Sequence, residues 1–243
     1  MERWKYGKMK IIVAITLLLP LQLGADDPKI RVTPLTEDFY VHTSYHKIDN
    51  VSFPSNGLII STKSGAILID TAWGNEQTVQ VLQWIKENLK MPVRFAILTH
   101  FHDDRTGGIQ ELKNRNIPSY ANRRTIQKMK SLNLPVPDRL LKDEMDFRMD
   151  DLVFKILYPG HGHSEDNIVV WFPLSKVLFG GCLVKSPQTK SLGNIKDANL
   201  VEWPKMIRSL EKSYSNAKFV IPGHEAWGGP EAFRRTLELL SGH

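Results

Sequence analysis

The sequence predicts an α/β fold in which two β-sheets face each other and helices cover their outer sides. Short apolar runs typical of strands occur in both halves of the 243-residue chain. Segments whose apolar residues recur at helical spacing lie between these runs, again in both halves. Because sheets and helices each bury an apolar face, this alternation favours layers of helix and sheet around a common core.

Residues 1–25 are expected to be a secretory signal peptide outside this fold. The basic stretch MERWKYGKMK precedes the apolar run IIVAITLLLPLQLGA and the polar DDPK, an order typical of a cleaved leader. The alternative is a membrane anchor. The run is short of the roughly 20 apolar residues that a span needs, and Pro20 and Gln22 interrupt its end. We therefore expect a periplasmic protein, cleaved after Ala25, with no membrane segment left.

A hairpin is expected from GLIIST and GAILID around the turn Lys63-Ser64-Gly65. A helix over residues 75–90 should follow, with Asn75 as its N-cap. The next expected elements are a strand in VRFAILT, a helix in TGGIQELKNRN and a strand in IPSYA. In the second half we expect strands in LVFKILYPG, NIVVWFP, KVLFGGCLV and AKFVIPG, and helices in LVEWPKMIRSLEKSYS and GPEAFRRTLELLSG.

Charge argues against a nucleic-acid-binding protein. The leader carries four of the 32 Lys/Arg and one of the 26 Asp/Glu, which leaves 28 against 25 in the mature chain. The densest basic stretch, KNRNIPSYANRRTIQKMK, has Tyr120 as its one aromatic residue and is typical of a solvated helix face. The single cysteine, Cys182, cannot form an intrachain disulfide, so it is either a buried small hydrophobe or a functional thiol.

The stretch ILTHFHDDRTGG indicates a metal site at the end of a strand. In extended backbone, His100 and His102 point the same way, and Asp104 continues the alternation if the chain stays extended. Imidazole suits zinc, copper, iron and nickel. Taken alone, a His-x-His pair is also compatible with ordinary surface histidines.

Further candidate ligands follow other apolar strands. His163 lies in PGHGHSEDN, Cys182 ends VLFGG, and His224 follows FVIPG. Rigid strands that deliver side chains to one shared edge are a common way to build a site. The joint occurrence favours one metal centre over several unrelated loop residues.

The runs THFHDDRTGG, PGHGHSEDNIVVWFP, GGCLVKS and PGHEAW, in this order, resemble the metallo-β-lactamase superfamily and within it the subclass B1 lactamases. The resemblance covers nearly the whole mature chain. It implies a four-layer αββα sandwich, with two facing mixed sheets and helices outside, formed by residues 26–243 as a single domain.

Three positions distinguish this chain from sister groups. Hydroxyacylglutathione hydrolases, lactonases and ribonuclease Z-like members typically have a further histidine where this chain has Arg105. They also use a later bridging aspartate where this chain has Cys182. The first position is His100 rather than asparagine, which argues against the single-zinc B2 group.

The resemblance implies two Zn²⁺ ions per chain. His100, His102 and His163 would hold one, and Asp104, Cys182 and His224 the other. It further implies that a metal-bound hydroxide, oriented by Asp104, attacks the strained amide of a β-lactam and confers antibiotic resistance. Zinc accepts each of these ligand types and keeps a position open in catalytic sites.

The resemblance also assigns substrate contacts. Lys185 would pair with the carboxylate of an anionic substrate, although an exposed lysine is the plain alternative. Asn194 would lie near the reacting carbonyl, although asparagine after glycine is also common turn chemistry. The segment Ser44–Gly57 would form a mobile flap that carries Phe53, with Trp73 on the opposite wall.

Two further residues would lie beneath the metals. Asp70, which ends GAILID, resembles a carboxylate that orients the ligands, or it caps a strand end. Arg105 would form a salt bridge or hydrogen bond under the second zinc, or it is a surface charge. The alternatives to a monomeric β-lactamase are another hydrolase of the superfamily, acting on thioesters or lactones, and a zinc-binding protein without turnover.

Overall fold

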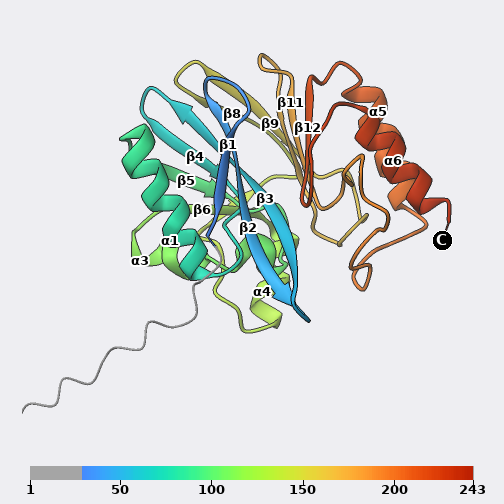
Figure 1. The fold of residues 1–243 in the computed structure, drawn as a ribbon, viewed down its shortest axis with the longest axis horizontal. Coiled ribbons are helices and arrows are strands. Elements are labelled where there is room, and N and C mark those ends of the chain that lie inside the picture. Colours follow the sequence, from blue (N-terminus) through green and yellow to red (C-terminus); the bar gives the residue numbers. More distant parts are fainter. Residues whose placement is uncertain (1–28, 243) are drawn as a thin grey trace, which may run out of the picture.

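The computed structural model describes residues 29–242, so the expected signal peptide lies outside the described residues. Two sheets face each other and helices cover both outer sides (Figure 1). This arrangement confirms the predicted α/β sandwich. Within residues 29–242, no helix is long and apolar enough to cross a membrane.

The first sheet has seven strands in chain order, and the second has five strands in the order β12-β11-β10-β9-β8. The first consists of β1 (Arg31–Pro34), β2 (Phe39–Ile48), β3 (Val51–Thr62), β4 (Gly65–Ile69), β5 (Val93–Ile97), β6 (Ser119–Asn122) and β7 (Arg139–Leu141). The second consists of β8 (Glu144–Met149), β9 (Leu152–Leu157), β10 (Val169–Phe172), β11 (Val177–Gly181) and β12 (Phe219–Pro222). Both sheets are mixed: β4 to β7 run parallel, as do β11 and β12, and the other neighbours are antiparallel.

The helices form the two outer layers. α1 (Asn75–Trp84), its π-helical continuation η1 (Ile85–Leu89), α3 (Ile109–Asn114) and α4 (Arg123–Ser131) lie on the side of the first sheet (Figure 1). α5 (Trp203–Ser213) and α6 (Glu231–Leu240) cover the second sheet, and the short α2 (Asp103–Thr106) follows β5.

The strand period of two explains how one sheet serves two cores. In β3, Leu58 and Ile60 face the core between the sheets, whereas Ile59 packs on the outer side with Val81 of α1. All three β3 residues are fully buried because helices cover the outer face. On α5, Trp203, Ile207 and Leu210 recur at helical spacing and pack onto the second sheet.

One local prediction was wrong. Asn75 is not the N-cap of α1; Gly74 occupies that position with a φ of 87°, and no side chain caps the helix. The side chain of Asn75 instead accepts a hydrogen bond from the backbone N–H of Glu111, which ties α1 to α3. Glycine suits this position because a backbone with positive φ has the lowest steric cost in a residue that lacks a Cβ atom.

Candidate active site

Three histidine rings converge at the edge of the sandwich where β5 ends. His102 Nδ1 lies 3.0 Å from His100 Nε2 and 3.2 Å from His163 Nε2. Two zinc-bound nitrogens in tetrahedral geometry, with Zn–N of about 2.0–2.1 Å, lie about 3.3 Å apart. The spacing therefore fits three ligands of one ion.

The protonation of these rings also suits a metal. Burial holds the pKa of His100 and His163 well below the usual range, so both rings are neutral. His102 Nε2 lies 2.9 Å from the Asp197 carboxylate, a contact that orients the ring so that Nδ1 faces the other two rings. Neutral imidazoles are the ligating form.

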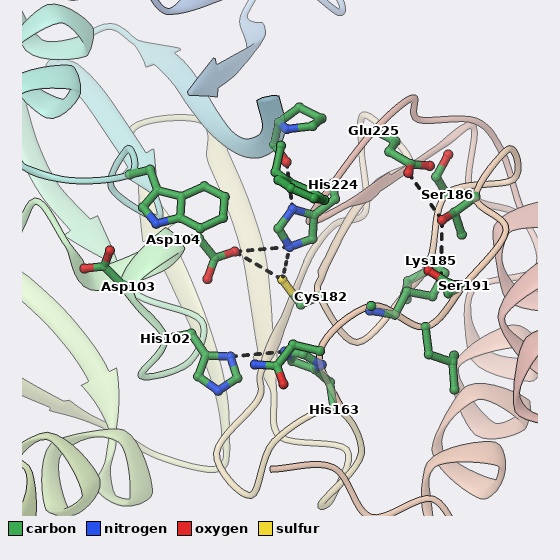
Figure 2. A pocket seen from close by; sticks show the side chains of 18 of the residues that line it. His102, Asp103, Asp104, His163, Cys182, Lys185, Ser186, Ser191, His224 and Glu225 are labelled. Atoms are coloured by element: carbon green, nitrogen blue, oxygen red, sulfur yellow. Dashed lines mark hydrogen bonds and ion pairs between the residues drawn. The ribbon is translucent and has the colours of Figure 1, made fainter. Parts of the chain in front are cut away.

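A second group of donors lies beside the first. Cys182 Sγ is 3.5 Å from Asp104 Oδ2 and 3.2 Å from His224 Nε2, and these last two atoms are also 3.2 Å apart (Figure 2). His224 Nδ1 donates to the carbonyl of Pro54 at 2.7 Å, so Nε2 is the ring nitrogen that faces Cys182 and Asp104. One ring nitrogen of His100 also lies within 4.8 Å of the donor atoms of Asp104 and Cys182, so the two groups of donors are adjacent.

The route by which Asp104 reaches this group differs from the prediction. The backbone does not stay extended past His102; it turns into α2, which starts at Asp103. His102 keeps extended geometry, with φ −63° and ψ 153°, at the N-cap of that helix. The helical turn, rather than strand alternation, therefore orients the Asp104 carboxylate.

Arg105 lies beneath the second group and is fully buried. Its Nη2 is 2.8 Å from Asp104 Oδ2 and donates to Cys182 Sγ at 3.1 Å and to the carbonyl of Gly223 at 2.6 Å. Its Nη1 contacts the Asn56 carbonyl and lies 3.3 Å from Asp70 Oδ2. A surface role for Arg105 is therefore excluded, and the guanidinium fixes Asp104 and Cys182 relative to each other.

Asp70 does not belong to either group of candidate ligands but contacts Arg105, which lies beneath the second group. Its carboxylate accepts from the backbone N–H and the hydroxyl of Thr99, at 2.7 and 2.8 Å, just ahead of His100. Burial raises the pKa of Asp70 to about 7, although Arg105 and Thr99 act in the opposite direction. Asp70 thus holds the chain segment that carries the histidines.

The electrostatics of the second group favour a bound cation. Burial alone would raise the pKa of Asp104, but the Arg105 guanidinium, His224 and His100 together outweigh it and hold the pKa well below the usual range. Burial would lower the pKa of His224, but the neighbouring Cys182 and Asp104 outweigh it and raise the pKa to about 10, so the site stabilises a positive charge at Nε2 and a bound metal would displace the proton there. Carboxylate, thiolate and imidazole together are a ligand set that zinc accepts.

A cavity of about 480 Å³ opens beside both groups. Its lining includes His102, Asp104, His163, Cys182 and His224, together with the predicted substrate contacts Phe53, Trp73, Lys185 and Asn194. Figure 2 shows Asp103 and Asp104 on one side of this cavity and Lys185 on the other. The structure thus brings every predicted metal ligand and substrate contact to one place.

The predicted substrate contacts differ in their surroundings. Lys185 is 8% exposed, and its ammonium lies 5.2 Å from the centroid of the Trp203 ring. Burial lowers the pKa of Lys185. Asn194 lines the cavity through a turn in which its Oδ1 accepts from the backbone N–H of Lys196 at 3.0 Å.

The predicted flap is the hairpin of β2 and β3. Asp49 and Asn50 form its turn with φ of 48° and 65°, as a tight hairpin requires. Phe53 lines the cavity and so does Ile48, which the sequence did not single out. Trp73 stacks on His46 of the same hairpin, with ring centroids 4.8 Å apart, and so joins the flap to the opposite wall.

Sequence reasoning missed Asp197 and Asn56. Asp197 orients His102 from a loop far along the chain, and no spacing motif marks it. Asn56 contacts Arg105 through its carbonyl, and its side-chain amide donates to the carbonyls of Pro222 and Glu225 at 3.1 and 2.7 Å, on either side of His224. The strand pattern gave no signal for Asn56 beyond a polar residue in a buried strand.

Known proteins that are similar to this chain belong to one family. The profile of the metallo-beta-lactamase superfamily matches residues 51–224. The chain is 34% identical to a metallo-beta-lactamase type 2 of Bacteroides fragilis over 95% of each chain. It is 36% identical to one from Bacillus cereus, with 87% of this chain and 82% of the relative covered.

Solved structures agree with this. A metallo-beta-lactamase from Pontibacter korlensis superposes with a TM-score of 0.86 at 40% identity, covering 88% of this chain and all of that one. FIM-1 from Pseudomonas aeruginosa, solved in its mono-zinc form, gives 0.83 at 35% identity, covering 90% and 97%. The chain therefore belongs to the metallo-β-lactamase superfamily and, as its motifs indicated, to the B1 group within it.

Proposed function

We propose that this protein hydrolyses the amide bond of β-lactam antibiotics with two zinc ions and thereby confers resistance. The observation that carries the proposal is the pair of adjacent donor groups that face one cavity with Lys185 on its far side. The curated relatives are named metallo-beta-lactamases. The thiolate and the lysine favour this activity over thioester or lactone hydrolysis.

Each zinc has a proposed ligand set. One ion would be held by His100, His102 and His163, whose nitrogens have the spacing of a tetrahedral site. The other would be held by Asp104, Cys182 and His224. When bound, zinc supplies a Lewis acid and lowers the pKa of a coordinated water to near neutrality.

The side chains of the protein have complementary tasks. Asp104 stays ionised beside Arg105 and can accept a hydrogen bond from the attacking water, which orients it. Lys185 would bind the substrate carboxylate, and Asn194 would donate to the carbonyl oxygen of the scissile amide. Phe53 and Trp73 would cover the apolar parts of the substrate and exclude water.

We further propose that residues 1–25 direct export to the periplasm and are then removed. The basic and apolar composition of this segment supports the proposal. We propose that the mature chain binds no nucleic acid, since its net charge is small, and that it is a monomer, as the resemblance to the family implies. N-terminal sequencing of the exported protein and its mass in solution test these points.

Hydrolysis of a chromogenic cephalosporin by the purified protein tests the activity. The wild type should open the lactam, a chelator should abolish the reaction, and added zinc should restore it. Parallel assays with a thioester and a lactone should show far lower kcat/KM. Turnover that ignores the chelator, or a preference for the thioester, would overturn the proposal, and zinc binding with no turnover would indicate a binding protein.

A further inference from the structure

The cavity contains a carboxylate that the reaction described above does not use. Glu225 follows His224 directly and lines the cavity on the same side as Lys185 (Figure 2). Among residues 29–242, no Lys, Arg or His nitrogen lies within 4.0 Å of this carboxylate; Thr189 donates to its Oε1 at 3.3 Å. The negative charge is therefore open to a ligand.

The backbone holds Glu225 in place at some energetic cost. Its φ is 62°, in the left-handed region that favours glycine over side-chain-bearing residues. Its carbonyl accepts from the Asn56 side chain at 2.7 Å, which fixes the peptide next to His224. The backbone that carries this carboxylate is thus anchored beside His224.

This charge is unfavourable for a purely anionic substrate. Lys185 attracts the substrate carboxylate, whereas Glu225 on the same side repels it. The charge of Glu225 is among those that counteract the effect of burial on the pKa of Lys185, so the two charges act on each other along the same side of the cavity. A substrate with a cationic group next to its carboxylate would use both charges.

We propose that Glu225 is a specificity-determining residue that favours zwitterionic β-lactams, in which a cationic substituent lies next to the carboxylate that binds Lys185. The cationic substituent would lie at the rim of the cavity, where Glu225 is exposed. This inference rests on the proposed β-lactamase activity and names a substrate class within it.

The test compares two cephalosporins that share an acyl side chain. One carries a quaternary ammonium group at the ring carbon next to the carboxylate-bearing carbon, and the other carries an uncharged group there. In Glu225→Gln, the ratio of kcat/KM for the cationic over the uncharged substrate should fall about threefold to tenfold, mainly through KM. Glu225→Lys should lower the ratio further, and 0.5 M salt should reduce both differences.

Two matched variants separate a specific contact from a general charge effect. Asp103→Asn removes the carboxylate on the opposite side of the cavity, and Glu37→Gln removes an exposed charge that does not line it. The ratio should change less in the first and stay constant in the second. Equal changes in Glu225→Gln and Asp103→Asn, or no change in Glu225→Gln, would overturn the inference while leaving the lactamase activity intact. A wild type that hydrolyses neither compound would instead refute the proposed function.

Discussion

At the scale of residues, the side chains around the second donor group are packed so closely that a small substitution there should disturb the metal ligands. Arg105 makes close contacts with Asp104, Cys182 and the carbonyl of Gly223 while fully buried. Breaking a buried ion pair by removing one partner leaves the other charge uncompensated. The residues around Arg105 therefore serve the geometry of the second donor group as much as the fold.

Gly223→Ala should impair the second metal site. A Cβ atom at this position would lie 2.5 Å from Cys182 Sγ and 2.6 Å from Arg105 Nη2, which is closer than real contacts allow. We expect bound zinc to fall below two per chain and kcat to drop at least tenfold. Metal analysis and lactam hydrolysis measure this. Gly242→Ala is a suitable control, since the nearest atom to its Cβ position is 3.7 Å away and the residue does not line the cavity. An unchanged zinc content in Gly223→Ala would contradict the geometry.

Lys185→Ala should mainly raise KM for substrates that carry a carboxylate, since the ammonium lies in the cavity wall and not among the metal ligands. Loss of a charge-assisted contact of about 1.5–3 kcal/mol corresponds to roughly a tenfold to hundredfold rise in KM. Lys185→Arg should recover part of the loss. Steady-state kinetics decide, and an effect confined to kcat would argue against an anchoring role.

His42 gives the expected pH dependence of stability. The ring is fully buried and its Nε2 lies 3.3 Å from the Asp70 carbonyl. Burial lowers the pKa of His42 to about 4, below its ordinary value of 6.5. The unfolded chain therefore binds the proton first as the pH falls, and stability that is present above pH 6.5 is lost toward pH 4.

This loss amounts to about 3 kcal/mol when the shift is converted to free energy. Urea unfolding of the wild type and His42→Gln at several pH values measures it. The difference between their free energies of unfolding should shrink by up to this amount between pH 6.5 and 4. Parallel stability curves would show that His42 does not titrate as described.

At the scale of elements, the β2–β3 hairpin extends over the cavity and has apolar residues exposed near its tip. Phe53 and Val51 are 42% and 55% exposed on the same strand, but only Phe53 lines the cavity. Such exposed apolar side chains at the mouth of a cavity are typical of ligand contacts. Val51 is therefore a matched control for Phe53, since it is exposed on the same strand but does not line the cavity.

Phe53→Ala should weaken binding of substrates with a bulky apolar substituent. Covering about 50 Å² of apolar surface contributes about 1 kcal/mol, so KM should rise about fivefold. Val51→Ala should change KM less, because its side chain lies outside the cavity lining. Kinetics with substrates of graded size test the difference, and equal effects of both changes would exclude a specific contact.

The elements also show what the sequence could predict. Strand ends that carry His100, Cys182 and His224 were recognisable because apolar runs stop just before them. The helical turn at Asp104 and the contact between Asp197 and His102 were not. The first depends on hydrogen bonds of the loop to its surroundings, and the second joins residues 95 positions apart with no local pattern. Tertiary contacts, not propensity, decided both.

At the scale of the whole molecule, the donors come from both halves of the sandwich. His100 and His102 follow β5 of the first sheet, whereas Cys182 and His224 follow β11 and β12 of the second. The core between the sheets is continuous, with Ile97 of β5 and Phe179 of β11 among its buried residues. Metal ions bound at this edge would therefore link the two sheets.

Zinc should accordingly stabilise the fold. At a free concentration 100 times the dissociation constant, one ion contributes about 2.7 kcal/mol. For a domain of this size, that shifts Tm upward by about 5 to 10 °C. Thermal unfolding with zinc and with a chelator measures the shift, and Cys182→Ser should lose part of it. Identical Tm values in zinc and chelator would contradict ligands shared by the two sheets.

Anomalous diffraction at the zinc edge from a zinc-soaked crystal tests the central claim most directly. We expect two peaks about 3.5–4 Å apart, one surrounded by His100, His102 and His163 and the other by Asp104, Cys182 and His224. A single peak, or a second ion with Cys182 outside coordination distance, would contradict the dinuclear centre on which the proposed hydrolysis rests.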